Sequence, residues 1–149
     1  MSDNLMHATL VEMAGQGVLL AGKSASGKSD LAFRLIENKK AVLVADDVVE
    51  LRFQDGVIIG SAPLNLRGLL EIRGIGVIEF PYKDSTIIKM VVHLQEDLPQ
   101  MERMPKNRCE NILGLEIPQI DLYAKESSAP DKVIAALKVL VTKELRREE

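Results

Sequence analysis

Residues 17–29 read GVLLAGKSASGKS, and this stretch decides the fold class. Its first five residues form a short apolar run, which is typical of a buried strand. The next eight, from Gly22 to Ser29, match the pattern G-x-x-x-x-G-K-[ST] at every defined position. Such a loop wraps phosphate oxygens with successive backbone N–H groups, because its glycines allow a tight turn. The stretch therefore predicts a strand, a phosphate-binding loop and a helix in succession.

The last two loop residues have expected tasks. Lys28 would reach the β- and γ-phosphates of a nucleotide, and Ser29 would supply its hydroxyl to Mg²⁺. The helix that begins near Lys28 directs the positive end of its dipole at the same anion. A plain Gly/Ser turn between strand and helix is the alternative. The other candidate nucleotide-binding residues are Gly22, Lys23, Ser24, Ala25, Ser26 and Gly27, of which Lys23 and Ser24 fill free positions of the pattern and are expected to face solvent.

Outward from the loop, strand-like runs alternate with two helical patterns. An Asp55-Gly56 pair between apolar runs predicts a β-hairpin. Residues 95–128 hold three prolines and are expected to be mostly irregular. Pro130-Asp131 opens a final helix. The chain thus predicts one α/β domain over residues 1–149, a mixed sheet with flanking helices. The expected strands cover residues 7–13, 17–21, 41–45, 48–53, 57–60, 70–80 and 86–94.

Composition narrows the classes of function. The chain of 149 residues has 19 Lys+Arg and 22 Asp+Glu, a net charge of −3, without the basic excess of nucleic-acid or membrane-surface binders. Aromatic residues make up 3%, too few for base-stacking platforms. No apolar run approaches the roughly 20 residues of a transmembrane helix. Cys109 is the only cysteine, so an internal disulfide is excluded. We expect a cytoplasmic protein with no nucleic-acid and no membrane partner.

Acidic residues stand at two further places. Asp46 and Asp47 follow the strand expected at residues 41–45, which would lie beside the loop. Ligands of open α/β sheets bind at such strand ends. One aspartate could hold Mg²⁺ through water while the other accepts a proton from an attacking hydroxyl, or both form an exposed acidic turn. Glu71 and Arg73, two apart on an expected strand, could bind a metal and neutralise phosphoryl charge, or form only a surface ion pair.

Several stretches in this order resemble the catalytic domain of the HPr kinase/phosphorylase family. They are residues 7–11 (HATLV), the phosphate loop, residues 44–52 (VADDVVELR), residues 59–63 (IGSAP) and residues 70–78 (LEIRGIGVI). The resemblance implies a P-loop-containing mixed sheet similar to that of phosphoenolpyruvate carboxykinase. It also implies an enzyme that uses ATP and Mg²⁺ to phosphorylate a serine of the phosphocarrier protein HPr. Such kinases regulate the phosphotransferase system and are commonly homo-oligomers, namely hexamers.

The same resemblance implies roles for single residues. Asp47 would accept the proton of the serine hydroxyl, and Lys28 would contact the transferred phosphate. By itself, a lone histidine such as His7 is more often structural than functional. The resemblance nevertheless makes His7 an active-site residue. The implied set is completed by Ser29, Glu71 and Asp46 around Mg²⁺, and by Arg103 as the candidate for an arginine used in phosphate removal.

Two departures from the family pattern shape the expected activity. Longer members carry an additional N-terminal domain, and the match here begins at His7, as in short forms from alphaproteobacteria. Residues 80–84 (FPYKD) replace the glycine-rich segment expected after residues 70–78. Kinase activity is therefore better supported than reverse phosphorolysis. Two alternatives stay open: a P-loop kinase of a small metabolite, although residues 95–128 offer no recognisable lid, and a nucleotide-binding regulatory module without catalysis.

Overall fold

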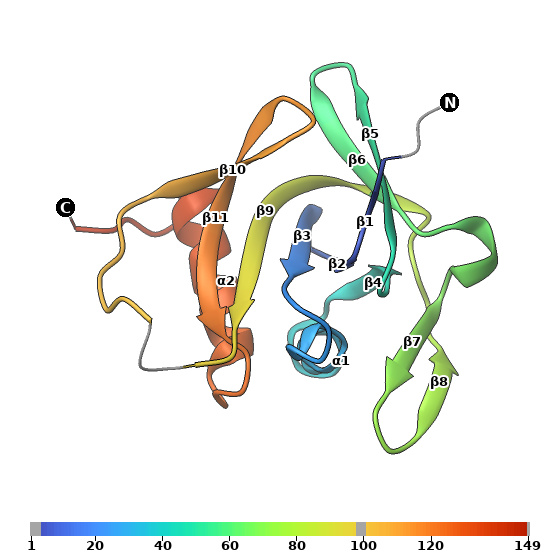
Figure 1. Ribbon diagram of the computed structural model, residues 1–149. Coiled ribbons are helices and arrows are strands. Elements are labelled where there is room, and N and C mark those ends of the chain that lie inside the picture. Colours follow the sequence, from blue (N-terminus) through green and yellow to red (C-terminus); the bar gives the residue numbers. More distant parts are fainter. Residues whose placement is uncertain (1–3, 98–100, 149) are drawn as a thin grey trace.

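A mixed sheet of nine strands dominates the part of the chain that the computed structural model describes, residues 4–97 and 101–148 (Figure 1). Seven strands form a continuous path in the order β1-β5-β6-β9-β3-β2-β4, and β10 and β11 extend the sheet from β9. The strands of this path are β1 (Leu5–Met6), β5 (Val49–Gln54), β6 (Val57–Ser61), β9 (Ser85–Gln95), β3 (Gln16–Ala21), β2 (Ala8–Met13) and β4 (Val42–Ala45). The expected mixed α/β fold is confirmed.

The long strand β9 joins two halves of the sheet. Its first residues pair antiparallel with β6, and its later residues pair in parallel with β3 on one side and β11 (Leu115–Tyr123) on the other. Gly17 lies where β9 changes neighbours, and a Cβ there would stand 2.4 Å from the carbonyl oxygen of Ile87. Only glycine lets β3 approach β9 this closely, so Gly17 sets the position of the strand that leads into the loop.

Two helices cover one face of the sheet. α1 (Lys28–Lys39) and α2 (Ala129–Leu140) pack on side chains of β2, β3, β9 and β11. A second buried cluster fills the opposite face, between these strands and β5, β6 and β10 (Arg108–Ile112). The sheet is therefore buried on both faces at its centre, which explains why β3 and β4 read as continuous apolar runs. No helix in the described ranges is long and apolar enough to cross a membrane.

Two local features differ from expectation. Residues 70–80 form a separate hairpin, β7 (Leu69–Ile72) and β8 (Gly76–Glu79), because Gly74 in the turn and Gly76 at the start of β8 take positive φ values. Residues 95–128 contain the β10–β11 hairpin, and Pro118 is tolerated because it precedes the part of β11 that pairs with β9. β4 is separated from β3 by β2, which lies between them and pairs antiparallel with both.

The expected hairpin around Asp55-Gly56 is present as β5 and β6. Both turn residues have positive φ, +53° and +82°, as a two-residue type I′ turn requires. A short 3₁₀ turn, η1 (Leu64–Leu66), then connects β6 to β7. This connection brings the β7–β8 hairpin back to the edge of the phosphate loop.

Candidate active site

The phosphate loop connects the end of β3 to the first residue of α1. Lys28 is buried, and its Nζ donates to the carbonyl oxygens of Gly22 and Lys23, both at 3.0 Å. The hydroxyl of Ser26 is buried without a hydrogen-bond partner in the described chain, and a Cβ at Gly22 would lie 2.6 Å from it. An unsatisfied buried hydroxyl and a confined ammonium group, set at a helix N-terminus, are groups that a phosphate would satisfy. Lys23 and Ser24 are exposed, as expected.

Asp46 ties the loop to two other strands. Its Oδ1 accepts hydrogen bonds from the Ser29 hydroxyl at 2.7 Å and from the Thr9 hydroxyl at 2.9 Å. Its Oδ2 accepts the backbone N–H of Glu71 at 3.2 Å. One half-buried carboxylate thus holds together α1, β2 and β7 at the carboxyl end of β4. These partners offset the cost of burying it.

Asp47, the next residue after Asp46, is exposed. Its φ is +70°, and the Val48 N–H donates to the Asp46 carbonyl at 2.8 Å across it. This is a γ-turn with positive central φ, the rare and strained form. The turn directs two adjacent aspartates to different surroundings, so Asp46 is tied to the loop while the Asp47 carboxylate stays open to solvent. The alternative that both aspartates form an exposed acidic turn therefore applies to Asp47 but not to Asp46.

His7 lies next to the same turn. It stands between β1 and β2, and the following residue, Ala8, donates its N–H to the Asp47 carbonyl at 3.2 Å. The residue before His7, Met6, pairs with Val49 of β5, two residues after Asp47. His7 is exposed, so the structure brings its exposed imidazole to the neighbourhood of Asp47.

Glu71 reaches the site through its strand. Its backbone binds Asp46, and its side chain is exposed on β7. Arg73 lies beyond β7, in the turn, and no ion pair joins it to Glu71 among the described residues. The alternative of a Glu71–Arg73 surface ion pair is therefore not observed among the described residues. The carboxylate remains available at the rim of the loop.

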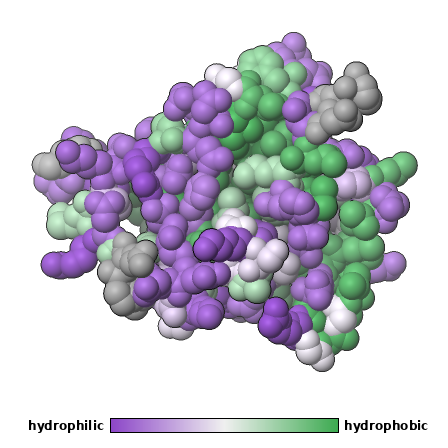
Figure 2. Space-filling view, in the orientation of Figure 1, coloured by the Kyte–Doolittle hydropathy of each residue, from purple (hydrophilic) through white to green (hydrophobic). Residues whose placement is uncertain are grey.

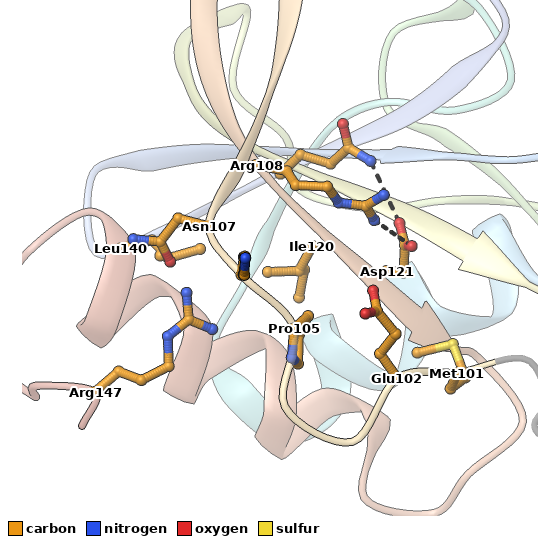
Figure 3. Close-up of a pocket in the computed structure, with 11 residues that line it drawn as sticks. Met101, Glu102, Pro105, Asn107, Arg108, Ile120, Asp121, Leu140 and Arg147 are labelled. Carbon is orange, nitrogen blue, oxygen red and sulfur yellow. Dashed lines mark hydrogen bonds and ion pairs between the residues drawn. The ribbon is translucent and has the colours of Figure 1, made fainter. Parts of the chain in front are cut away.

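Arg103 lies apart from these residues. It is exposed in the segment between β9 and β10, and no hydrogen bond or ion pair links it to the loop in the described ranges. Its neighbours Met101, Glu102 and Pro105 border a pocket of about 70 Å³ against β11 and α2 (Figure 3). In Figure 1 this segment lies on the side of β9 and β11 away from β7 and β8.

The donor set suits a nucleotide-bound magnesium ion rather than an all-protein metal cage. Within residues 4–97 and 101–148, no group of three or more His, Cys, Asp or Glu side chains could hold a metal. Mg²⁺ is commonly bound by one or two carboxylates together with substrate phosphates and waters. Ser29, Asp46 and Glu71 fit that requirement at the mouth of the loop. His93 is not part of it, because its ring binds Glu110 on β10.

One member of the site was missed from the sequence. Thr9 bonds Asp46, yet it sits within the apolar run of β2 and is fully buried. Its only signal was a hydroxyl residue placed inside a strand that is otherwise nearly all apolar. Because threonine is common in strands, that signal alone does not identify a site residue.

Comparison with known proteins gives a consistent picture. A family described as HPr Serine kinase C-terminal domain matches residues 1–146. An HPr kinase/phosphorylase of Clostridium botulinum (strain Eklund 17B / Type B) is 35% identical over 128 residues, 79% of this chain and 42% of that protein. The one from Malacoplasma penetrans (strain HF-2) is 34% identical over 152 residues, 92% and 50% respectively. The chain thus spans half or less of the length of these curated relatives.

A solved structure shows the same likeness in three dimensions. The Hpr(Ser) kinase/phosphatase from Coxiella burnetii superposes with a TM-score of 0.81 at 26% identity. The match covers 91% of this chain and 89% of that one. The resemblance expected from the motifs is confirmed in both sequence and fold.

Proposed function

The chain belongs to the family of HPr serine kinase C-terminal domains, and from this premise we propose that it is an ATP-dependent kinase that phosphorylates a serine of HPr. The observation that carries the proposal is the arrangement around the two aspartates. Asp46 joins the loop residue Ser29 to the strand of Glu71, while Asp47 is left exposed at the same place. This provides a phosphate-binding loop and a free carboxylate base side by side.

The proposed reaction is an in-line transfer of the γ-phosphoryl group of ATP. Backbone N–H groups of residues 22–29 hold the phosphates, and the Lys28 ammonium exchanges its two carbonyl partners for phosphate oxygens. Asp47 accepts the proton of the serine hydroxyl as its oxygen bonds to phosphorus and ADP leaves. Mg²⁺, when bound, neutralises phosphate charge, and Ser29, Asp46 and Glu71 are the residues that would hold it. His7 lies beside Asp47, where it can contact the incoming serine.

The surface beside the site supports a protein substrate. Figure 2 shows apolar side chains on the side of the molecule that carries β7 and β8. Ile75 and Val77 of this hairpin are 70% and 63% exposed. Exposed apolar patches are typical of protein interaction sites, whereas a small metabolite needs an enclosed pocket.

We extend the proposal to a homo-hexamer. Light scattering after size-exclusion chromatography would test this oligomeric state, and a monomer at all concentrations would contradict it.

The direct test is phosphoryl transfer to HPr. The protein is incubated with HPr, ATP and Mg²⁺, and phosphoserine is located by mass spectrometry; HPr with that serine replaced by alanine is the control. ATP binding without transfer contradicts the proposal and favours a regulatory module. ATP turnover that HPr does not stimulate favours a small-metabolite kinase. Loss of phosphoserine after adding inorganic phosphate would show that the reverse reaction also occurs.

A further inference from the structure

We propose that Thr9 is a positioning residue of this site, and that its hydroxyl assigns different tasks to the two adjacent aspartates. The inference rests on the proposed function for its catalytic consequence. It goes beyond that function because Thr9 touches neither nucleotide nor substrate serine in the scheme above. It acts through Asp46 and Asp47 alone.

The hydroxyl of Thr9 contacts both aspartates. It donates to Asp46 Oδ1 at 2.9 Å, and it accepts the backbone N–H of Asp47 at 3.5 Å, a long contact. A hydroxyl has one proton and two lone pairs, so it can make both bonds at once. The first bond holds the Asp46 carboxylate toward Ser29, and the second holds the strained turn at Asp47.

The place of Thr9 in the sheet explains how it does this. It lies on β2, the strand inserted between β3 and β4, opposite Leu20 of the strand that leads into the loop. Its exposed fraction is 0%, so no water competes for the hydroxyl. Most buried hydroxyls have hydrogen-bond partners, and both partners of Thr9 belong to the acidic pair.

The position of the Asp47 carboxylate affects the rate of the proposed phosphoryl transfer. Without the bond from Thr9, Asp47 loses a contact that favours its φ of +70°, a backbone conformation costly for any residue other than glycine. Relaxation of the turn would move the Asp47 carboxylate away from its place beside the loop. Misplacement of a reacting group by about 1 Å can cost about 10²-fold in rate.

The first test compares three variants in the transfer assay. Thr9→Val keeps the shape and removes the hydroxyl, and we expect its kcat to fall about 10- to 100-fold, with a smaller change in KM for ATP. Thr9→Ser keeps the hydroxyl and should recover most of kcat. Thr142→Val is the matched control, because that buried hydroxyl has no hydrogen-bond partner among the described residues. Equal losses in Thr9→Val and Thr9→Ser would overturn the proposal, since keeping the hydroxyl would then make no difference to the rate.

The second test does not depend on kinase activity. Hydrogen–deuterium exchange of the peptide that spans residues 44–50 reports on the amides of Asp47 and Val48. We expect faster exchange in Thr9→Val, and unchanged exchange in Thr9→Ser and Thr142→Val; equal rates in Thr9→Val and wild type would overturn the proposal. If the wild type transfers no phosphate but the exchange differs as expected, the kinase proposal fails and the positioning contact stands. Should Thr9→Val fail to fold, Thr9→Cys serves instead, because a thiol is only a weak donor.

Discussion

Asp46 and Asp47 are chemically identical neighbours that the fold treats differently. Asp46 accepts three hydrogen bonds and holds three elements together, whereas Asp47 is exposed in a strained turn. A positive φ at a residue other than glycine costs about 1–3 kcal/mol, and such strain concentrates at functional sites. The hydrogen bonds to Asp46 and the turn at Asp47 together separate a structural acceptor from a candidate base.

Substitution of Asp47 by asparagine tests the base. Asn adopts positive φ at least as readily as Asp, so the turn should persist while the proton acceptor is lost. We expect phosphoryl transfer to fall about 10²–10⁴-fold, with ATP affinity nearly unchanged in calorimetry. Asp55→Asn is the control, because Asp55 also has positive φ but lies in a distant hairpin turn. Near-normal transfer by Asp47→Asn would remove Asp47 from this role.

Lys28→Ala should weaken both ATP binding and transfer. In the structure the ammonium group is confined between two loop carbonyls, so its charge is held at the expected phosphate position. Charge stabilisation at a transition state is worth about 10²–10³-fold in rate when one donor is removed. Lys23→Ala changes an exposed lysine at a free position of the same loop and should leave kcat and ATP affinity unchanged. Undiminished activity of Lys28→Ala would contradict the loop's role.

Local elements were predictable where their determinants are local. The loop, α1 and the β5–β6 hairpin follow from short-range signals: a phosphate-loop pattern, apolar periodicity and an Asp-Gly turn. The β7–β8 and β10–β11 hairpins were missed because their turns, at Gly74 and at Leu113-Gly114, look like interruptions within apolar or proline-containing runs. The neighbours of β9 also escaped prediction, since strand order depends on contacts far apart in sequence.

The attachment of α1 to the β11–α2 connection gives a prediction at this scale. Arg34 donates to the carbonyl oxygens of Ala124 and of Glu126, the latter at 3.1 Å. Arg34→Met keeps the aliphatic stem and leaves the buried carbonyl of Ala124 without this donor. We expect urea denaturation to show a loss of about 1–3 kcal/mol in the free energy of unfolding. The exposed Arg52, whose Nε binds Gln54 on its own strand, supplies the control Arg52→Met; equal losses in the two variants would refute the attachment.

At the scale of the whole molecule, one half-buried glutamate on β2 links this strand to the start of β9 and to the segment before it. Glu12 of β2 accepts hydrogen bonds from Thr86 at 2.6 Å and from Lys83 at 2.9 Å. Burial acts to raise the pKa of Glu12, but the bonds from Thr86 and Lys83 and the lysine charge outweigh it. The pKa is therefore lowered from its usual 4.5, and the charged form stabilises the fold.

The sign of this shift predicts how stability depends on pH. A lowered pKa in the folded state contributes stability above the usual value of 4.5, and that stability is lost as pH falls through the folded-state pKa. Glu12→Gln should therefore be less stable than wild type at neutral pH, and the difference should shrink on acidification. Urea titrations across this range measure it, with Glu37→Gln, an exposed change on α1, as control. A difference that stays constant with pH would contradict the assignment.

The sequence by itself determined the chemistry that residues 17–29 can perform, because a loop's pattern of glycines, lysine and serine acts within a few residues of backbone. Its motifs also identified the family, and they marked His7, Asp46, Asp47 and Glu71 as candidate active-site residues. Only the tertiary structure decided which aspartate is tied to the loop and which is free, that Thr9 lies between them, and that Arg103 stands elsewhere. These outcomes depend on β2 being inserted between β3 and β4 and on the positive φ at Asp47. Both follow from packing between segments distant in the chain, which no local pattern encodes.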